Sequence, residues 1–249
     1  DSITIAYSKP EAILKLDTLG HTDMIKYIIT TNSGDIISAS ADKTIRVWDS
    51  KTGKEKRKIL GQIGPDGEGK VYAIALSSDE KYLAVGGFLD KSKNYENNET
   101  LENYENGQIR IYDYETGLLI KILKSHKTSL LDLAFSKDSD GSRYLISGSG
   151  DKTAKIWNVE NNFELYDTIQ FHTDSVYAVN IINKNNQYFA VTAGLDGKVA
   201  LYNIETKRII NSQSNNYNLQ YLANTSNNGG EIATCGEGKE ILIYDYTLN

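Results

Sequence analysis

The chain has 249 residues, 39% of them hydrophobic, and carries a formal net charge of −6 with a pI of about 5.2. This charge does not favour nucleic acid as a partner, because phosphate binding needs Lys and Arg gathered on one face. No apolar run approaches the roughly 18 residues of a membrane-spanning helix, so we expect no membrane partner either. The single cysteine, Cys235, excludes an internal disulfide and fits a reducing compartment, which predicts an intracellular, cytoplasmic protein.

A pair formed by an aromatic residue and a short polar residue recurs along the chain. The pairs are Tyr7-Ser8, Trp48-Asp49, Tyr112-Asp113, Trp157-Asn158, Tyr202-Asn203 and Tyr244-Asp245. Four of the five intervals between successive pairs are 41 to 45 residues long, and the interval before Tyr112 is 64. A period of this length is typical of four-stranded sheets that cannot bury their own faces and stack on their neighbours.

The repeat divides the chain into consecutive units within a single domain. Residues 1–17 predict two strands of a partial unit, followed by the full units A (18–60), B (61–123), C (124–170) and D (171–213), and a three-stranded unit E (214–249). In unit C, strands are expected over 129–135, 143–148, 153–158 and 163–169, joined by turns rich in Gly, Asp, Asn and Ser. No stretch keeps a 3.6-residue period, so the fold class is all-β with almost no helix.

Two segments carry a family likeness. ISASADKTIRVWD (Ile37 to Asp49) and ISGSGDKTAKIWN (Ile146 to Asn158), with Gly20-His21 and Ser125-His126 upstream, resemble the signature of the WD-repeat (WD40) family. The resemblance covers nearly the whole chain and implies a β-propeller of four-stranded antiparallel blades, with five to six blades visible. Because a seven-bladed ring needs more strands than these units supply, we expect the chain to be part of such a ring.

The family's buried hydrogen-bond relay joins a His, a Ser or Thr, an Asp and an aromatic residue, and its spacing fits three units. The residues that the resemblance assigns are His21, Ser38, Asp42 and Trp48 in unit A; His126, Ser147, Asp151 and Trp157 in unit C; and His172, Thr192, Asp196 and Tyr202 in unit D. Because Tyr202 offers a hydroxyl in place of an indole N–H, the relay of unit D is expected to be rearranged. Unit B has Val85 or Gly86 at the hydroxyl position, and unit E has Gly238 at the aspartate position. We expect packing alone to hold these two units and to leave them softer.

All three histidines of the chain fall on relay positions, so none remains as a catalytic base or a metal ligand. We therefore predict no catalytic residue, no metal, no cofactor and no enzymatic activity. The stretch Gly64 to Lys70 matches a phosphate-loop pattern, but Val71 follows it and it leads into a strand. Asp138 to Gly141 resembles the start of a calcium loop without the distal Glu, and predicts a hairpin turn.

Candidate partner contacts lie on the face that carries the relay turns. An acidic insertion at 88–107 accounts for the 64-residue interval and has a net charge of −3. It is either a disordered loop or an arm that binds a basic partner through Tyr95, Glu99, Glu102 and Tyr104. The other candidates are Asp23, Met24, Lys127, Asp174 and Leu195.

Two functions follow from these expectations. The first is a non-enzymatic scaffold that recognises a protein through its loop-bearing face. The alternative is a sensor or regulatory propeller that packs on a signalling domain (an NTPase, a kinase or a peptidase) of the same, larger polypeptide.

Overall fold

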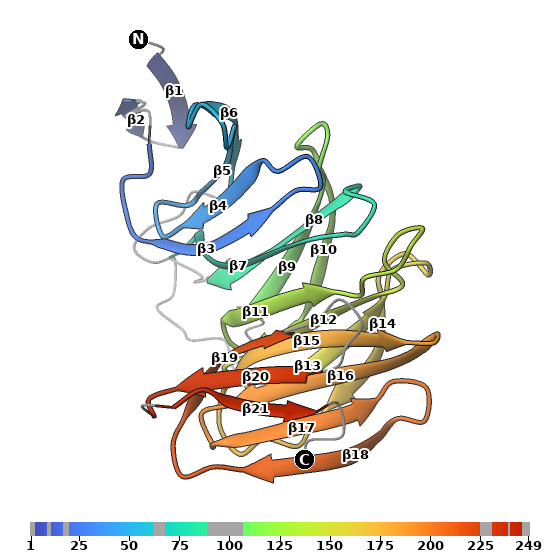
Figure 1. Cartoon of the computed structure of the whole chain (residues 1–249). Coiled ribbons are helices and arrows are strands. Elements are labelled where there is room, and N and C mark those ends of the chain that lie inside the picture. The colour runs from blue at the N-terminus through green and yellow to red at the C-terminus, as the bar shows by residue number, and fades with distance from the viewer. Residues whose placement is uncertain are drawn as a thin grey trace, which may run out of the picture.

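The computed structural model describes residues 3–8, 11–16, 20–61, 68–88, 107–224, 231–238 and 240–245. Within these ranges the regular elements are the strands β1 to β21, and none is a helix (Figure 1). The all-β class predicted from the sequence is therefore confirmed. The same ranges contain no helix long and apolar enough to cross a membrane.

The strands group into six antiparallel sheets. A two-stranded sheet contains β1 (Ile3–Ser8) and β2 (Glu11–Leu16). Unit A contains β3 (Ile25–Thr30), β4 (Ile36–Ser40), β5 (Thr44–Trp48) and β6 (Glu55–Leu60). Unit B contains β7 (Lys70–Leu76), β8 (Tyr82–Phe88), β9 (Gly107–Asp113) and β10 (Leu119–His126). Unit C contains β11 (Leu130–Phe135), β12 (Tyr144–Ser149), β13 (Ala154–Asn158) and β14 (Glu164–Ile169). Unit D contains β15 (Val176–Lys184), β16 (Gln187–Gly194), β17 (Lys198–Asn203) and β18 (Arg208–Ser214). Unit E contains β19 (Leu219–Asn224), β20 (Glu231–Gly236) and β21 (Leu242–Asp245).

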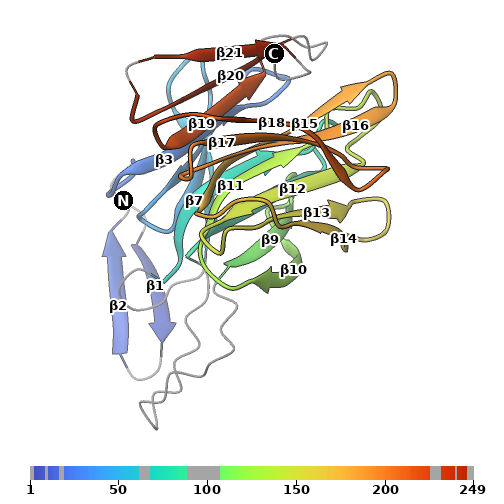
Figure 2. The same ribbon diagram turned by 90° about the horizontal axis from the view of Figure 1, so that it is seen from below.

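Every sheet is a meander in which strands pair in chain order. The four strands expected in unit C lie within one residue of the observed ones. From unit B onward, the first strand of each unit packs against the sheet of the unit before it. Figures 1 and 2 show the units following one another in this way from blue to red. Because strand directions alternate, the turns between second and third strands share one end of the units with the connections between units.

In the described part of the chain the hydrophobic core has four clusters, and each draws its buried side chains from two neighbouring units. One cluster joins units A and B through residues such as Ile45 and Leu83, and another joins units C and D through Ile156 and Val176. The remaining two clusters join B to C and D to E. Burying a single Ile or Leu contributes about 1.5–3 kcal/mol. A unit on its own would leave half of each cluster in water, so stability depends on stacking.

The first strand of every unit from A to E contains a β-bulge at the same place. The register shifts fall between Ile25 and Tyr27, Val71 and Ala73, Leu130 and Asp132, Val176 and Ala178, and Leu219 and Tyr221. The residue skipped by the pairing is Lys26, Tyr72, Leu131, Tyr177 or Gln220. A bulge changes the direction of the side chains beside it. Here this happens once in the first strand of each unit from A to E.

Candidate functional site

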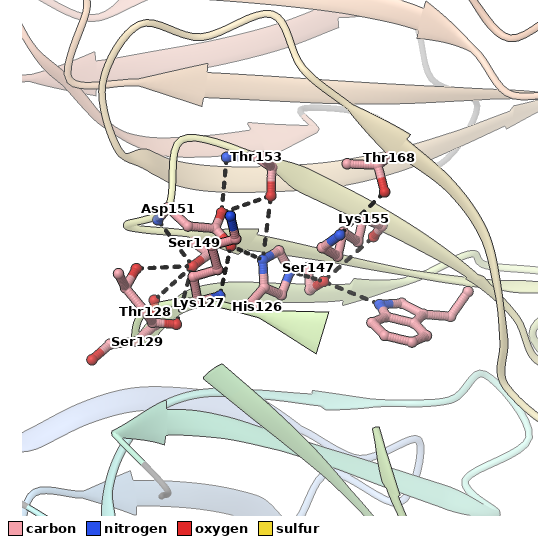
Figure 3. Close-up of polar contacts among 11 residues, drawn as sticks. His126, Lys127, Thr128, Ser129, Ser147, Ser149, Asp151, Thr153, Lys155 and Thr168 are labelled. Carbon is pink, nitrogen blue, oxygen red and sulfur yellow. Dashed lines mark hydrogen bonds and ion pairs between the residues drawn. The ribbon is translucent and has the colours of Figure 1, made fainter. Parts of the chain in front are cut away.

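Unit C contains a chain of hydrogen bonds that runs from the turn end of its sheet into the core. His126 lies between two partners (Figure 3): its Nδ1 is 2.9 Å from Oδ2 of Asp151, and its Nε2 is 2.8 Å from Oγ of Ser147. The indole N–H of Trp157 donates to the same Ser147 oxygen at 3.1 Å. His126 and Ser147 have no exposed surface, so these groups find in one another the partners that water would otherwise supply.

The ends of this relay have fixed directions. The indole N–H of Trp157 can only donate and the Asp151 carboxylate can only accept, so Nδ1–H of His126 donates to Asp151. Burial by itself raises the pKa of the Asp151 carboxyl, but hydrogen bonds from His126, Thr153 and the Lys127 N–H outweigh it and hold this pKa well below its usual range. Asp151 is therefore a carboxylate, and both ring nitrogens of His126 are engaged in the relay.

Unit A repeats the arrangement. His21 lies 2.9 Å from Oδ2 of Asp42 and 2.7 Å from Oγ of Ser38, and Trp48 donates to Ser38 at 2.7 Å. Burial raises the pKa of Asp42, but hydrogen bonds from Thr44, from the backbone and from His21 bring it down to about 2. In units A and C the structure thus brings together all four residues that the sequence assigned to each relay.

The relay of unit D is shorter. His172 lies 2.9 Å from Oδ1 of Asp196 and 2.8 Å from Oγ1 of Thr192. The Tyr202 hydroxyl donates instead to Asp167 of β14, in the neighbouring unit C. Burial lowers the pKa of His172, and its bond to Asp196 offsets this only in part, so this imidazole is neutral at pH 7.

Unit E is not held by packing alone, which corrects the expectation from its sequence. Asn215 precedes Leu219 by four residues, as His126 precedes Leu130, and so takes the place of the missing histidine. The hydroxyl of Tyr244 donates to Oδ1 of Asn215 at 3.2 Å. One hydrogen bond therefore connects the aromatic position to the histidine position directly.

The remaining relay space of unit E is filled by a ring. A Cβ built on Gly238 would lie 2.6 Å from the ring of Tyr217, so this ring occupies the room that an aspartate uses in units A, C and D. Within the described residues, the Tyr217 hydroxyl and Oγ1 of the buried Thr234 have no hydrogen-bond partner. Unpaired buried hydroxyls cost stability, in keeping with the prediction that this unit is softer.

Unit B has an apolar residue at the relay hydroxyl position. Val85 lies opposite Ile74 in the sheet, as Ser147 lies opposite Leu133 in unit C. Unit B nevertheless buries the polar side chains of Glu68 and Gln108, which are 7% and 4% exposed. The expectation that it relies on apolar packing alone is therefore too simple for this unit also.

A cavity of about 510 Å³ lies beside the relay turns, a volume within the range of ligand pockets. Its walls come from the bulged first strands of all five units. The side chains used in the argument below are Tyr27, Tyr72, Asp132, Tyr177 and Tyr221. Sequence reasoning missed this cavity, because its wall is assembled from residues that are spread over nearly 200 positions.

The described partner-contact candidates lie at the relay end of the units, which is the end that carries the turns between second and third strands and the connections between units. They are Asp23, Met24, Lys127, Asp174 and Leu195, of which Leu195 is half-buried and the others are exposed. Asp23 and Met24 also line the cavity. The four candidates of the acidic insertion, Tyr95, Glu99, Glu102 and Tyr104, lie outside the described residues. Among the described residues, no group of three or more His, Cys, Asp and Glu is placed to hold a metal ion.

The family model described as "WD domain, G-beta repeat" matches residues 13–49, 117–158 and 163–203. These three segments contain every relay residue of units A, C and D. The chain belongs to the WD-repeat family. Unit E and most of unit B lie outside the matched segments, and these are the units in which the relay is replaced.

Several curated proteins are similar to this WD-repeat chain. A "Ribosome biogenesis protein WDR12 homolog" of Trichoplax adhaerens is 28% identical over 191 residues, which are 75% of this chain and 38% of the relative. "Autophagy-related protein 16" of Arabidopsis thaliana is 20% identical over 86% of this chain and 36% of its own length. "WD repeat and SOCS box-containing protein 1" of Mus musculus is 36% identical over 73 residues, 29% of this chain and 17% of that protein. The chain thus spans less than two fifths of the length of these relatives.

Proposed function

We propose that this WD-repeat chain is a non-catalytic platform that binds another protein at the relay end of its units. The observation that carries the proposal is the cavity at that end, where Tyr27, Tyr72, Tyr177 and Tyr221 line one concave surface. Tyrosine is enriched in protein interfaces and at their energetic centres. A hollow of this kind accepts a side chain or a short segment of a partner.

The relatives support a binding module rather than one reaction. Their names refer to ribosome biogenesis, to autophagy and to a SOCS box, and these names have no reaction in common. The three histidines support the absence of catalysis, because each has both ring nitrogens engaged in its relay. We place the partner's further contacts on Lys127, Asp174 and Leu195 and on the acidic insertion. The acidic insertion suits a partner with a basic surface. We place this interaction inside the cell.

Site-specific photo-crosslinking tests the proposal. A photoreactive amino acid is placed at Met24 or Asp174, at the relay end, and at Asp140 or Asn186, in exposed turns at the opposite end. We expect the relay-end positions to capture a defined protein from native lysate and the opposite positions to capture none. Capture from the opposite end alone would contradict the proposal. A variant lacking residues 89–106 then shows whether the insertion takes part.

A second candidate function is packing against another part of a longer polypeptide. The observation that favours it is the outer strand region of unit B, where Leu118, Leu119, Ile120 and Ile122 are 38–68% exposed. The outer strand of unit A instead carries charges over residues 55–58, which discourage edge pairing. A photo-crosslink from position 120 to another segment of the same polypeptide supports this candidate, and one to a separate protein opposes it.

A further inference from the structure

The floor of the cavity contains a buried carboxylate. Asp132 is 7% exposed and lines the cavity. Its Oδ1 accepts hydrogen bonds from the Tyr27 hydroxyl at 2.8 Å and from the Leu133 N–H at 2.9 Å, and its Oδ2 accepts one from the Val179 N–H at 2.8 Å. All three donors are neutral. In the described part of the chain, no Lys, Arg or His forms an ion pair with this carboxylate.

This carboxylate differs from the other buried aspartates that face the relay end. Asp42, Asp151 and Asp196 each pair with an imidazole, and their hydrogen bonds depress their pKa values. Burial of Asp132 outweighs its three hydrogen bonds and raises its pKa to about 6. A buried charge without a counter-charge is costly, and such a group in a cavity is a candidate binding residue.

We propose that the cavity receives a positively charged side chain, ammonium or guanidinium, of a partner protein, which pairs with Asp132 and lies against the rings of Tyr72 and Tyr177. The inference rests on the proposed function and names the chemistry that its cavity recognises. Tyr72 and Tyr177 come from the bulges of units B and D, on either side of unit C, which contributes Asp132. A cation against tyrosine faces gains cation–π attraction in addition to its ion pair.

The charges around the cavity favour a cation over an anion. Lys26 and Lys70 also line it, but Lys26 is exposed and Lys70 is half-buried, so solvent screens their charges. Asp132 is the most buried charged group of the wall and acts in a lower local dielectric, where a charge interacts more strongly. An anion would meet this carboxylate, and a neutral side chain would leave its charge uncompensated.

Three small probes test the proposal on the whole chain by titration calorimetry at pH 7.5 and low salt. N-acetyl-arginine methylamide and N-acetyl-lysine methylamide carry the two cations, and N-acetyl-citrulline methylamide has nearly the shape of the first without its charge. We expect at least one cation to bind about tenfold or more tightly than the citrulline probe, because only the cations form a charge-assisted pair with the carboxylate. Equal binding of the charged and neutral probes, or no binding of either cation, would overturn the proposal.

Two variants assign the effect to the carboxylate. Asp132→Asn keeps the shape and should lower cation affinity about tenfold while leaving citrulline unchanged. The matched control is Asp138→Asn, which alters a carboxylate that holds the Tyr188 hydroxyl at 2.9 Å at the opposite end of the units and should leave all three affinities unchanged. If Asp132→Asn fails to fold, Tyr72→Leu removes one aromatic face and should weaken the cation alone. Cation affinity unchanged by Asp132→Asn, or by Tyr72→Leu where that variant replaces it, would overturn the proposed cation site.

The outcomes separate this inference from the proposed function. Crosslinks at Met24 without charge selectivity in the cavity would keep the platform and overturn the cation site. Charge selectivity that depends on Asp132, with no crosslink from the relay end, would keep the site and overturn protein recognition at that end.

Discussion

The hydroxyl of Tyr27 donates a hydrogen bond to Oδ1 of Asp132 at 2.8 Å, although the two residues are 105 positions apart. Tyr27 belongs to unit A and Asp132 to unit C, so the bond passes across unit B along the cavity wall. The other oxygen of Asp132 accepts from Val179 of unit D. One carboxylate of unit C therefore connects its own unit to both unit A and unit D.

Removing the hydroxyl of Tyr27 should weaken this connection. Tyr27→Phe leaves Oδ1 of Asp132 with one donor, and we expect the free energy of unfolding to fall by about 1.5–3 kcal/mol, as for hydrogen bonds to charged groups. Urea titration measures the change. Tyr166→Phe is the control, since the described residues give its hydroxyl no hydrogen bond. A loss from Tyr27→Phe no larger than that of the control would show that the bond between units A and C is not stabilising.

Stability should depend on pH through Asp132. Its pKa is raised from 3.8 to about 6 in the folded chain, so between these values the unfolded state loses a proton that the folded state keeps. The contribution is fully present below about pH 4 and is lost as the pH rises through about 6. Asp132→Asn cannot titrate, so the stability of the unmodified chain relative to this variant should fall across that window and be constant above pH 7.

Urea unfolding of both proteins from pH 4 to pH 8 measures this difference. The remaining titratable groups are common to the two proteins, and to a first approximation their contributions cancel. A difference that does not change with pH would show that Asp132 has the same pKa folded and unfolded.

The relays of units C and D should respond unequally to the loss of their hydroxyl. Ser147→Ala removes the partner of both His126 and Trp157, and should cost about 2–4 kcal/mol because two buried groups are left unpaired. Thr192→Val removes only the partner of His172, and should cost about 1–2 kcal/mol. Chemical denaturation gives both values. Equal costs would mean that the indole N–H of Trp157 contributes nothing to its relay.

Gly197 should tolerate no side chain. Gly197 has φ +74° beside the relay aspartate of unit D, and a Cβ there would lie 2.4 Å from the carbonyl oxygen of Asn215. Gly53 has nearly the same φ, +67°, with no atom within 4 Å of its Cβ position. Gly53→Ala should therefore cost only the left-handed backbone term, about 1 kcal/mol, and Gly197→Ala clearly more. Thermal unfolding of both variants tests this ranking. If Gly197→Ala lowers stability no more than Gly53→Ala does, a Cβ at position 197 does not clash.

The relay was predictable because the chain resembles a family whose relay spacing it keeps in three units. Six residues from Asp151 to Trp157 span one tight turn and one strand, so sequence distance fixes spatial distance. The partner of Tyr202 was not predictable, because Asp167 belongs to the neighbouring unit and the spacing within a unit does not encode contacts between units. Asn215 escaped notice for a related reason, since an amide replaces the histidine and no family pattern points to it.

The cavity was missed although a signal was present. Asp132 is the single charged residue in the otherwise apolar strand Leu130–Phe135, and a lone acid in a buried strand marks either a structural tie or a site. What the sequence could not supply is the convergence of five first strands, because that follows from how the units pack. Two of the candidates that the sequence did name, Asp23 and Met24, line the same cavity.

Each of the five first strands gives the cavity one side chain that the pairing of its sheet does not use. A residue skipped by the pairing has no partner directly across the strand, so its side chain is free of the register that holds the sheet together. The five skipped positions are a lysine, two tyrosines, a leucine and a glutamine. The same scaffold can therefore acquire a new specificity by exchanging these five side chains, one unit at a time, while the relays and the apolar clusters behind them remain untouched.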